Sequence, residues 1–346
     1  MKKFLMKVSV FAVYALLLQV IFPFIADPFN VFHDNNIRSN GVGFNSNYIK
    51  MKYILNHPDR FNAFLFGSSR VGAIHNEKIP ELRTYNMTYS AGLPSEHLAN
   101  IKTFLKNKIC PAKIYVGVDS YSYTDEISEH VKQPMRCPYE YLADDKIYLF
   151  TLFFDPAMAR QSLNIFLQKD SKNDNDNDIF HKYGWWGKYR AESKLDWNAK
   201  NIKPTYGKRF SDKNLRSTLN DIRETVNICH ENGIELVIFT NPMHNITYMA
   251  SVRELKYLEF LEGLASITEF YNFSSLNDIT LSNDNYRETS HYKAEVGDMI
   301  LNVICSDEIY PELYAQGFGV KVTKDNADEF IAMLKRQAEN YATETR

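Results

Sequence analysis

The sequence lacks an excess of charge of either sign. Its 346 residues carry 40 Lys and Arg against 42 Asp and Glu, a formal net charge of −2, and no basic stripe interleaved with aromatic residues is present. A chain without a positive field has no long-range attraction for a polyanion. We therefore expect no nucleic-acid partner.

Cysteine is scarce, and its spacing excludes two kinds of site. None of the four cysteines forms a Cys-x-x-Cys pair, which argues against a zinc knuckle and a thioredoxin-like redox motif. Three full disulfide pairings are open to them, and free, buried thiols are an equal alternative. The acidic run at 169–178 lacks the glycine and the closing glutamate of a calcium loop. We expect no metal and no cofactor.

What the sequence does contain begins with an apolar run at residues 8–26, which carries no charge. At 1.5 Å per residue it is just long enough for a hydrocarbon core of roughly 30 Å. Lysines lie before it in residues 1–7 and Asp27 follows, which predicts a cytoplasmic amino terminus. A cleaved signal peptide is the alternative, but Phe24 is bulky where a cleavage site needs a small residue. We expect a cytoplasmic tail at 1–7 and a retained single-pass transmembrane helix at 8–26.

From residue 62 onward, short apolar runs alternate with longer amphipathic ones, which is typical of a parallel sheet covered by helices. The predicted strands cover residues 63–66, 84–88, 113–118, 235–239 and 268–273. The predicted helices cover 96–106 with Ser95 as N-cap, a run from a Ser211 cap to a stop at Asn232-Gly233, 252–264, a segment after Tyr292, and 326–341. The sequence therefore predicts an α/β fold: a three-layer α/β/α domain with a mostly parallel five-stranded sheet.

The same pattern divides the chain. We expect a juxtamembrane segment at 27–61, an α/β domain at 62–305 with an insertion at 138–206, and a C-terminal helical extension at 306–346. The insertion holds an aromatic block, Tyr183-Gly184-Trp185-Trp186-Gly187, which either anchors it to the core or stacks on a sugar. The last helix should pack on the domain through Phe330, Ile331 and Leu334.

The first predicted strand ends abruptly. In "FLFGSSR", residues 64–70, three apolar residues are followed at once by glycine and two serines. Parallel sheets place their chemistry at the carboxyl ends of their strands. Ser69 is therefore a candidate nucleophile, although it needs a base, and turn material is the simpler interpretation.

A histidine with an acidic neighbour could supply that base. In "NYRETSHY", Glu288 lies three residues before His291, so that on one helical turn the carboxylate can orient the imidazole. The alternative is an ordinary helix start with Thr289 or Ser290 as the cap. Gly92, after the second strand, offers an open backbone N–H as a donor for a developing oxyanion.

The order of these residues resembles the SGNH (GDSL-like) hydrolase superfamily. Gly-Ser-Ser stands where that family has Gly-Asp-Ser, which implies that Ser69 is the nucleophile and Ser68 occupies the aspartate position. Gly92 matches the glycine of the second block, and Glu288-x-x-His291 matches the final Asp-x-x-His. The resemblance implies a Ser69, His291, Glu288 triad with the backbone N–H groups of Ser69 and Gly92 as the oxyanion hole.

The chain is similar, over nearly its whole length, to a membrane-anchored branch of that superfamily related to alginate O-acetylation proteins. The matching segments, in order, are "ADPFNVFH", "LFGSSRV", "YNMTYSAG", "IYVGVDSYSY" and "ETSHYKAEVGDMIL".

Three positions depart from the family pattern. Asp119 stands at the oxyanion asparagine, where an ionised carboxylate would repel an oxyanion, so it is protonated, turned away or outside the hole. Glu288 is one methylene longer than aspartate, which some serine hydrolases tolerate. Asn241 and His244, after the fourth strand, are substrate-binding candidates together with Arg70. The alternatives are that Asn241 or His244 replaces the missing oxyanion donor, or that they form a polar strand end facing solvent.

The resemblance implies a membrane-anchored serine esterase or O-acyltransferase, with acetyl as the expected acyl group. Its domain would be periplasmic or extracellular, its acceptor a cell-envelope polysaccharide, and its acyl donor supplied by a membrane partner. The main alternative is a catalytically inactive scaffold of an envelope polysaccharide assembly. A phosphoester-handling protein that uses the same turn as an anion site is a third.

Overall fold

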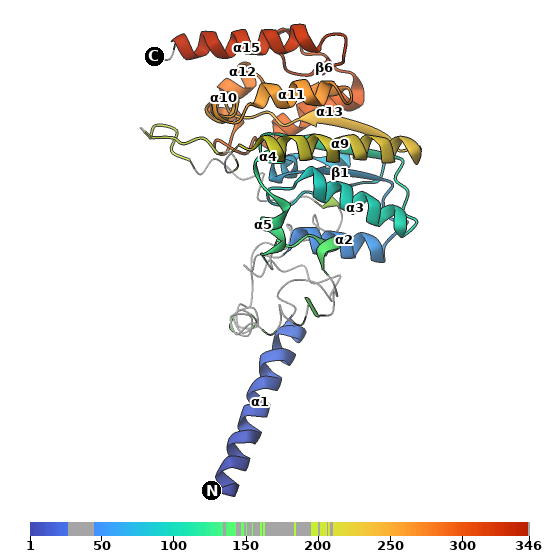
Figure 1. The fold of residues 1–346 in the computed structure, drawn as a ribbon, viewed down its shortest axis with the longest axis vertical. Coiled ribbons are helices and arrows are strands. Elements are labelled where there is room, and N and C mark those ends of the chain that lie inside the picture. The colour runs from blue at the N-terminus through green and yellow to red at the C-terminus, as the bar shows by residue number, and fades with distance from the viewer. Residues whose placement is uncertain are drawn as a thin grey trace.

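A computed structural model describes residues 1–26, 45–133, 136–142, 195–199, 201–205, 207 and 210–344, together with positions 147, 148, 150, 154, 160, 162, 183 and 184 (Figure 1). Much of the predicted juxtamembrane segment and most of the predicted insertion, including Trp185 and Trp186, lie outside these residues.

The first helix, α1 (Lys2–Ala26), lies apart from the α/β body in Figure 1, and most of its side chains are exposed. It is the one described helix that is long and apolar enough to cross a membrane, judged by length and composition. An apolar helix at the predicted position is therefore confirmed.

The body is α/β, built on one mixed sheet of six strands in the order β2-β1-β3-β4-β5-β6. Five strands pair in parallel: β1 (Ala63–Gly67), β2 (Thr84–Asn86), β3 (Lys113–Val118), β4 (Glu235–Thr240) and β5 (Phe270–Asn272). The sixth, β6 (Val320–Val322), runs antiparallel to β5 and was not predicted. The expectation of five strands was one short, because Val320-Lys321-Val322 is a three-residue strand with an exposed lysine at its centre and lies in the segment predicted to be a helical extension.

Alternate residues of the central strands face opposite sides of the sheet, and both sides are buried. In β1, Phe64 and Phe66 belong to one hydrophobic cluster and Leu65 to the other. In β3, Val116 and Tyr115 divide in the same way. This is why these strands read as continuous apolar runs rather than alternating ones.

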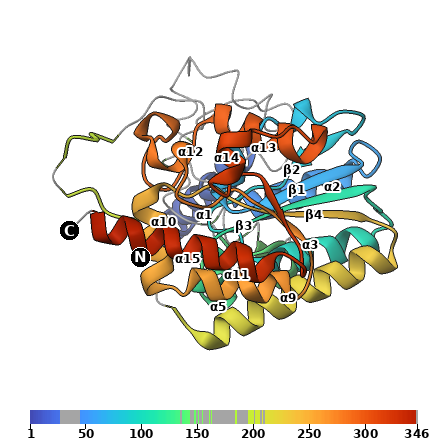
Figure 2. The ribbon, with the colours of Figure 1, turned by 90° about the horizontal axis from the view of Figure 1, so that it is seen from above.

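Helices cover the two faces of the sheet (Figure 2). The larger cluster packs α2, α3, α9, α11 and α15 on one face, and the smaller cluster packs α13 and a 3-10 helix, η1, on the other. The bounds are α2 (Ser46–Asn56), η1 (Ser69–Ala73), η2 (Asn76–Lys78), α3 (Pro94–Lys106), α4 (Tyr121–Thr124), α5 (Ile127–Val131), η3 (Tyr139–Tyr141), α9 (Asp212–Glu231), α10 (Asn245–Glu254), α11 (Tyr257–Ala265), α12 (Asp278–Leu281), η5 (Asn283–Asn285), α13 (Ala294–Ser306), α14 (Pro311–Ala315) and α15 (Ala327–Glu344).

Helix ends follow local chemistry, with two corrections. Ser211 caps α9 and Asn232 ends it, as predicted. Ser95 is not a cap, because Pro94 occupies the first helical position and the cap is Leu93. The single helix predicted at 252–264 is two helices, α10 and α11, separated at Lys256 with φ of 52°.

The C-terminal helix packs as expected. In α15, Phe330, Ile331 and Leu334 are buried within the larger cluster. Part of the predicted juxtamembrane segment also joins this cluster, since Met51 and Ile54 of α2 are buried there. The four cysteines are free thiols: Cys110 is exposed, Cys137 and Cys229 are buried, and Cys305 is partly buried.

Candidate active site

The candidate site lies where β1 ends, in the middle of the parallel sheet. β1 pairs with β2 on one side and β3 on the other, with Gly67 opposite Gly117. Ser68 then caps η1, and its hydroxyl accepts from the Arg70 N–H at 3.4 Å. Ser69 is the first residue of η1 and remains partly exposed.

The structure brings the three predicted triad residues together. Ser69 Oγ lies 2.8 Å from His291 Nε2, across 222 positions of sequence. The other ring nitrogen, Nδ1, is hydrogen-bonded to Glu288 Oε1. The side chains of His291 and Glu288 are 23% and 35% exposed, so solvent and small molecules can reach the chain of three groups.

The local structure around His291 differs from the predicted helical turn. Residues 286–292 form a loop closed by a bridge between Tyr286 and Tyr292, and the Arg287 N–H donates to the His291 carbonyl at 3.0 Å. The following helix, α13, begins at Ala294. Neither Thr289 nor Ser290 caps it, so the simple helix-start interpretation was wrong.

Glu288 is held in its ionised form. Burial raises the pKa of its carboxyl, but the hydrogen bond and charge of His291, the Ser290 N–H at 2.7 Å and the charge of Arg70 together bring the pKa below its ordinary value. An ionised carboxylate can orient the imidazole and stabilise it when it becomes protonated.

The Asp119 carboxylate is hydrogen-bonded to protein donors next to the serine turn. Its Oδ2 accepts from Ser68 Oγ at 2.9 Å and from Asn241 Nδ2 at 3.0 Å, and its Oδ1 pairs with Arg70 at 2.7 Å. The carboxylate is fully buried. Of the three interpretations offered for Asp119, this geometry favours a carboxylate turned away from the oxyanion hole, because both of its oxygens are bonded to protein donors.

Arg70 joins the two halves of the site. Besides Asp119, its guanidinium donates to the carbonyls of Ser290 at 2.9 Å and Thr205 at 3.2 Å. The side chain is 1% exposed. Arg70 therefore ties the serine turn to the loop that carries His291.

The other two substrate-binding candidates are also buried. Asn241 accepts from the Tyr292 hydroxyl at 3.2 Å in addition to its bond to Asp119. His244 Nε2 is hydrogen-bonded to Asn283 at 2.9 Å, and its ring stacks on Trp197 at 4.9 Å between centroids. Direct contact of substrate with Arg70, Asn241 or His244 stays a prediction; the structure shows each held by protein partners.

Gly92 lies beside the serine turn. A Cβ placed on it would be 2.6 Å from the Gly67 carbonyl oxygen, so only glycine fits here without a shift. Within the described chain, the backbone N–H groups of Ser69 and Gly92 have no protein acceptor. Both are therefore available as donors.

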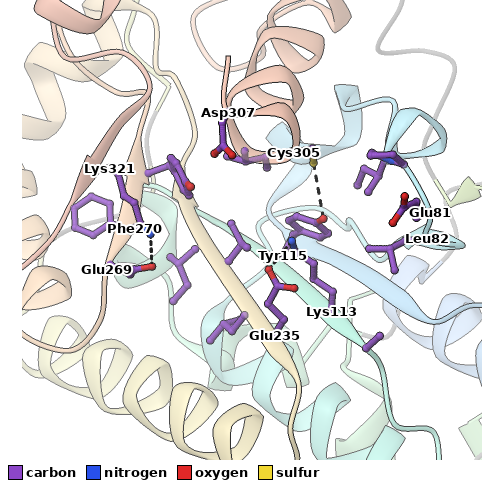
Figure 3. A pocket seen from close by; sticks show the side chains of 18 residues that line it. Glu81, Leu82, Lys113, Tyr115, Glu235, Glu269, Phe270, Cys305, Asp307 and Lys321 are labelled. Carbon is purple, nitrogen blue, oxygen red and sulfur yellow. Dashed lines mark hydrogen bonds and ion pairs between the residues drawn. The ribbon is translucent and has the colours of Figure 1, made fainter. Parts of the chain in front are cut away.

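A pocket of about 560 Å³ lies elsewhere, at the opposite end of the sheet (Figure 3). It is lined by the amino-terminal residues of β3, β4 and β5, and two ion pairs of 2.6 Å border it, Lys113–Glu235 and Lys321–Glu269. None of the triad residues lines it.

Sequence reasoning missed a second polar group next to Gly92, formed by Arg136 and Glu96. Arg136 lies just before the predicted insertion, where no motif marks it. Glu96 occupies the third position of α3, where a glutamate can accept from the N-cap backbone, and this position was the only signal for it. Among the described residues, no group of three or more His, Cys, Asp or Glu side chains is placed to hold a metal ion.

Comparison of the chain with protein-family models, curated proteins and solved structures finds no match. We therefore infer the function from the site geometry and from the motif resemblance.

Proposed function

We propose that this chain is a membrane-anchored serine esterase or O-acyltransferase of SGNH type that acts on an acetyl-type ester of a cell-envelope polysaccharide. One observation carries the proposal: a partly exposed serine at the end of a central parallel strand is hydrogen-bonded, at 2.8 Å, to a histidine whose other nitrogen binds a carboxylate.

The reaction follows from this arrangement. His291 Nε2 accepts the Ser69 proton while Ser69 Oγ attacks the ester carbonyl, whose π electrons move onto oxygen. The N–H groups of Ser69 and Gly92 are the donors for that oxyanion. When the carbonyl re-forms, the alkoxide leaves with the proton from His291, and an acyl-serine remains.

The second half repeats these steps with a new acceptor. His291 takes a proton from water or from a sugar hydroxyl, and the resulting oxygen attacks the acyl-serine. Water gives an esterase, whereas a sugar hydroxyl gives an O-acyltransferase. Throughout, Glu288 orients the imidazole. Asp119 and Arg70 hold the serine turn in place relative to the loop that carries His291.

The cellular setting is part of the proposal. The apolar α1 and the charges around it favour a single-pass anchor with a cytoplasmic amino terminus and a periplasmic or extracellular domain. The motif resemblance supports a polysaccharide acceptor and a membrane partner that supplies the acyl donor.

Replacement of the serine tests the proposal. The full chain in detergent should hydrolyse p-nitrophenyl acetate and become labelled by a fluorophosphonate. Ser69→Ala should abolish labelling and lower turnover by about 10³-fold or more. Ser128→Ala, which removes an exposed serine hydroxyl bonded to Glu126, is the matched control and should behave as wild type.

A wild-type protein that neither turns over nor labels would favour the inactive scaffold instead. If activity is present, the fate of the acetyl group separates the two enzyme classes. Release as acetate in the presence of an added oligosaccharide indicates an esterase, and transfer to a sugar hydroxyl indicates an acyltransferase.

A further inference from the structure

The Arg136 side chain is hydrogen-bonded to the loop that contains Gly92. Its Nε donates to the Ser90 carbonyl at 2.7 Å, and its Nη2 donates to the Ala91 carbonyl at 3.0 Å. The guanidinium also lies over the Tyr89 ring, 4.9 Å from its centroid. One side chain therefore contacts three consecutive residues immediately before Gly92.

The guanidinium is itself fixed by a buried carboxylate. Nη1 and Nη2 of Arg136 donate to the two oxygens of Glu96 at 2.8 and 2.7 Å, and the Glu96 side chain is 0% exposed. Glu96 also accepts from the Leu93 N–H at 2.9 Å and is bonded to His130 at 3.0 Å. A bidentate pair of this kind sets both the position and the plane of the guanidinium.

The bond to Ala91 bears directly on the Gly92 donor. The Ala91 carbonyl and the Gly92 N–H belong to one planar trans peptide unit, so they point in opposite directions. A donor that holds the oxygen on one side consequently aims the N–H toward the other side. Positive charge at the oxygen also polarises the unit and strengthens its N–H as a donor.

The backbone here needs such a restraint. Ala91 has φ of 48°, in the left-handed region that residues with a Cβ rarely adopt. Gly92 in turn packs against the Gly67 carbonyl, one residue before Ser68. The conformation that brings the two strand ends together is thus held from outside by Arg136.

We propose that Arg136, anchored by Glu96, is a positioning residue that aims and polarises the Gly92 N–H for the oxyanion. This inference rests on the proposed Ser69 chemistry. It differs from a purely structural salt bridge, because a structural role alone would change stability and leave transition-state stabilisation untouched.

Two variants test it on the full chain in detergent. Arg136→Lys keeps the charge and loses the forked geometry, and Arg136→Met combined with Glu96→Gln avoids leaving a buried charge unpaired. Both should retain the thermal transition of a folded protein. We expect kcat for p-nitrophenyl acetate to fall about 10- to 100-fold with KM within about twofold, and fluorophosphonate labelling of Ser69 to slow in proportion.

The matched control is Arg83→Met. Arg83 also donates to two loop carbonyls, those of Arg60 and Asp59, but it does so at the amino end of β2. The kcat of the Arg83→Met variant should match that of the wild-type protein. The pH profile of kcat/KM should also be unchanged in the Arg136 variants, because the Ser69–His291–Glu288 chain is intact.

The outcomes separate this inference from the proposed function. An inert wild type overturns both. Two results would overturn this inference alone, given a wild type whose activity depends on Ser69. In the first, the folded Arg136 variants keep the wild-type kcat. In the second, their loss of kcat equals that of the Arg83 variant. A crystal structure of phosphonylated wild type adds a test without substitutions: a phosphoryl oxygen that does not accept from the Gly92 N–H would also overturn it.

Discussion

At the scale of single residues, the proposed mechanism makes Glu288 the group that determines whether the Ser69–His291 pair can transfer a proton. Only an ionised acceptor keeps the Nδ1 proton in place, so that Nε2 is free to accept the proton of Ser69. Its lowered pKa shows that the surroundings of Glu288 favour this ionised form despite partial burial. The role of Glu288 is thus orientation and charge, which a neutral amide of the same shape cannot supply.

Replacing Glu288 by glutamine should therefore lower kcat about 10²- to 10⁴-fold, because the amide can hold the wrong tautomer of His291. The fold should remain intact. Steady-state hydrolysis of p-nitrophenyl acetate measures the loss. Glu295→Gln, an exposed carboxylate in the first turn of α13, is the control and should retain full activity. Wild-type turnover by Glu288→Gln would remove Glu288 from the mechanism.

At the scale of elements, the sequence carried the long, regular features well. The predicted strands at 63–66 and 113–118 match β1 and β3 because both faces of these strands are buried, so that, apart from Lys113 at the start of β3, their side chains are uncharged and mostly apolar. The break between α10 and α11 was missed because Lys256 is a left-handed residue without glycine or proline to mark it.

In the candidate site too, some features were predicted from the sequence and others were not. Ser69, Glu288 and His291 were identified because short motifs preserve their order along the chain. The sequence did not predict the hydrogen bonds and ion pair among Ser68, Arg70 and Asp119, or the ion pair between Arg136 and Glu96. These interactions join residues that only the folded sheet brings together.

One helix carries a carboxylate whose ionisation opposes folding. On α9, burial and the neighbouring Glu224 raise the pKa of Asp221 to about 6, although Lys102 acts in the opposite direction. The folded state then binds more protons than the unfolded state between pH 3.8 and about 6. Its contribution to stability is therefore fully present below about pH 4 and is lost as the pH rises through 6.

Asp221→Asn should consequently stabilise the protein at pH 7 and have little effect at pH 4. The difference between a pKa of 3.8 and about 6 is worth at most about 3 kcal/mol, and solvent screening of this partly buried group reduces the expected gain to about 1 kcal/mol. Thermal unfolding followed at both pH values measures it. An equal gain at pH 4 would refute the assignment.

At the scale of the whole molecule, the structure has three parts: an apolar helix, an α/β body and, at the carboxyl edge of its sheet, the hydrogen-bonded group of Ser69, His291 and Glu288. The carboxyl ends of β1 and β3 carry Ser69 and Asp119, whereas the pocket bordered by Lys113 and Glu235 lies at their amino ends. The two ends of one sheet are thus chemically distinct, and only one of them presents the triad.

Cys110 offers a direct test of where this body lies in a cell. It precedes β3 at the amino end of the sheet, away from the triad, and is the exposed one of the four thiols. If α1 is a retained anchor with its lysines in the cytoplasm, a membrane-impermeant maleimide should label Cys110 in intact spheroplasts of the expression host. Cys110→Ser in a Cys305→Ser background should remain unlabelled, because the remaining two thiols are buried. Labelling that requires lysis would place the body in the cytoplasm. The intact mass of the membrane-extracted chain completes the argument, because a cleaved signal peptide would remove the mass of α1 and release the body from the membrane, whereas an anchor keeps both.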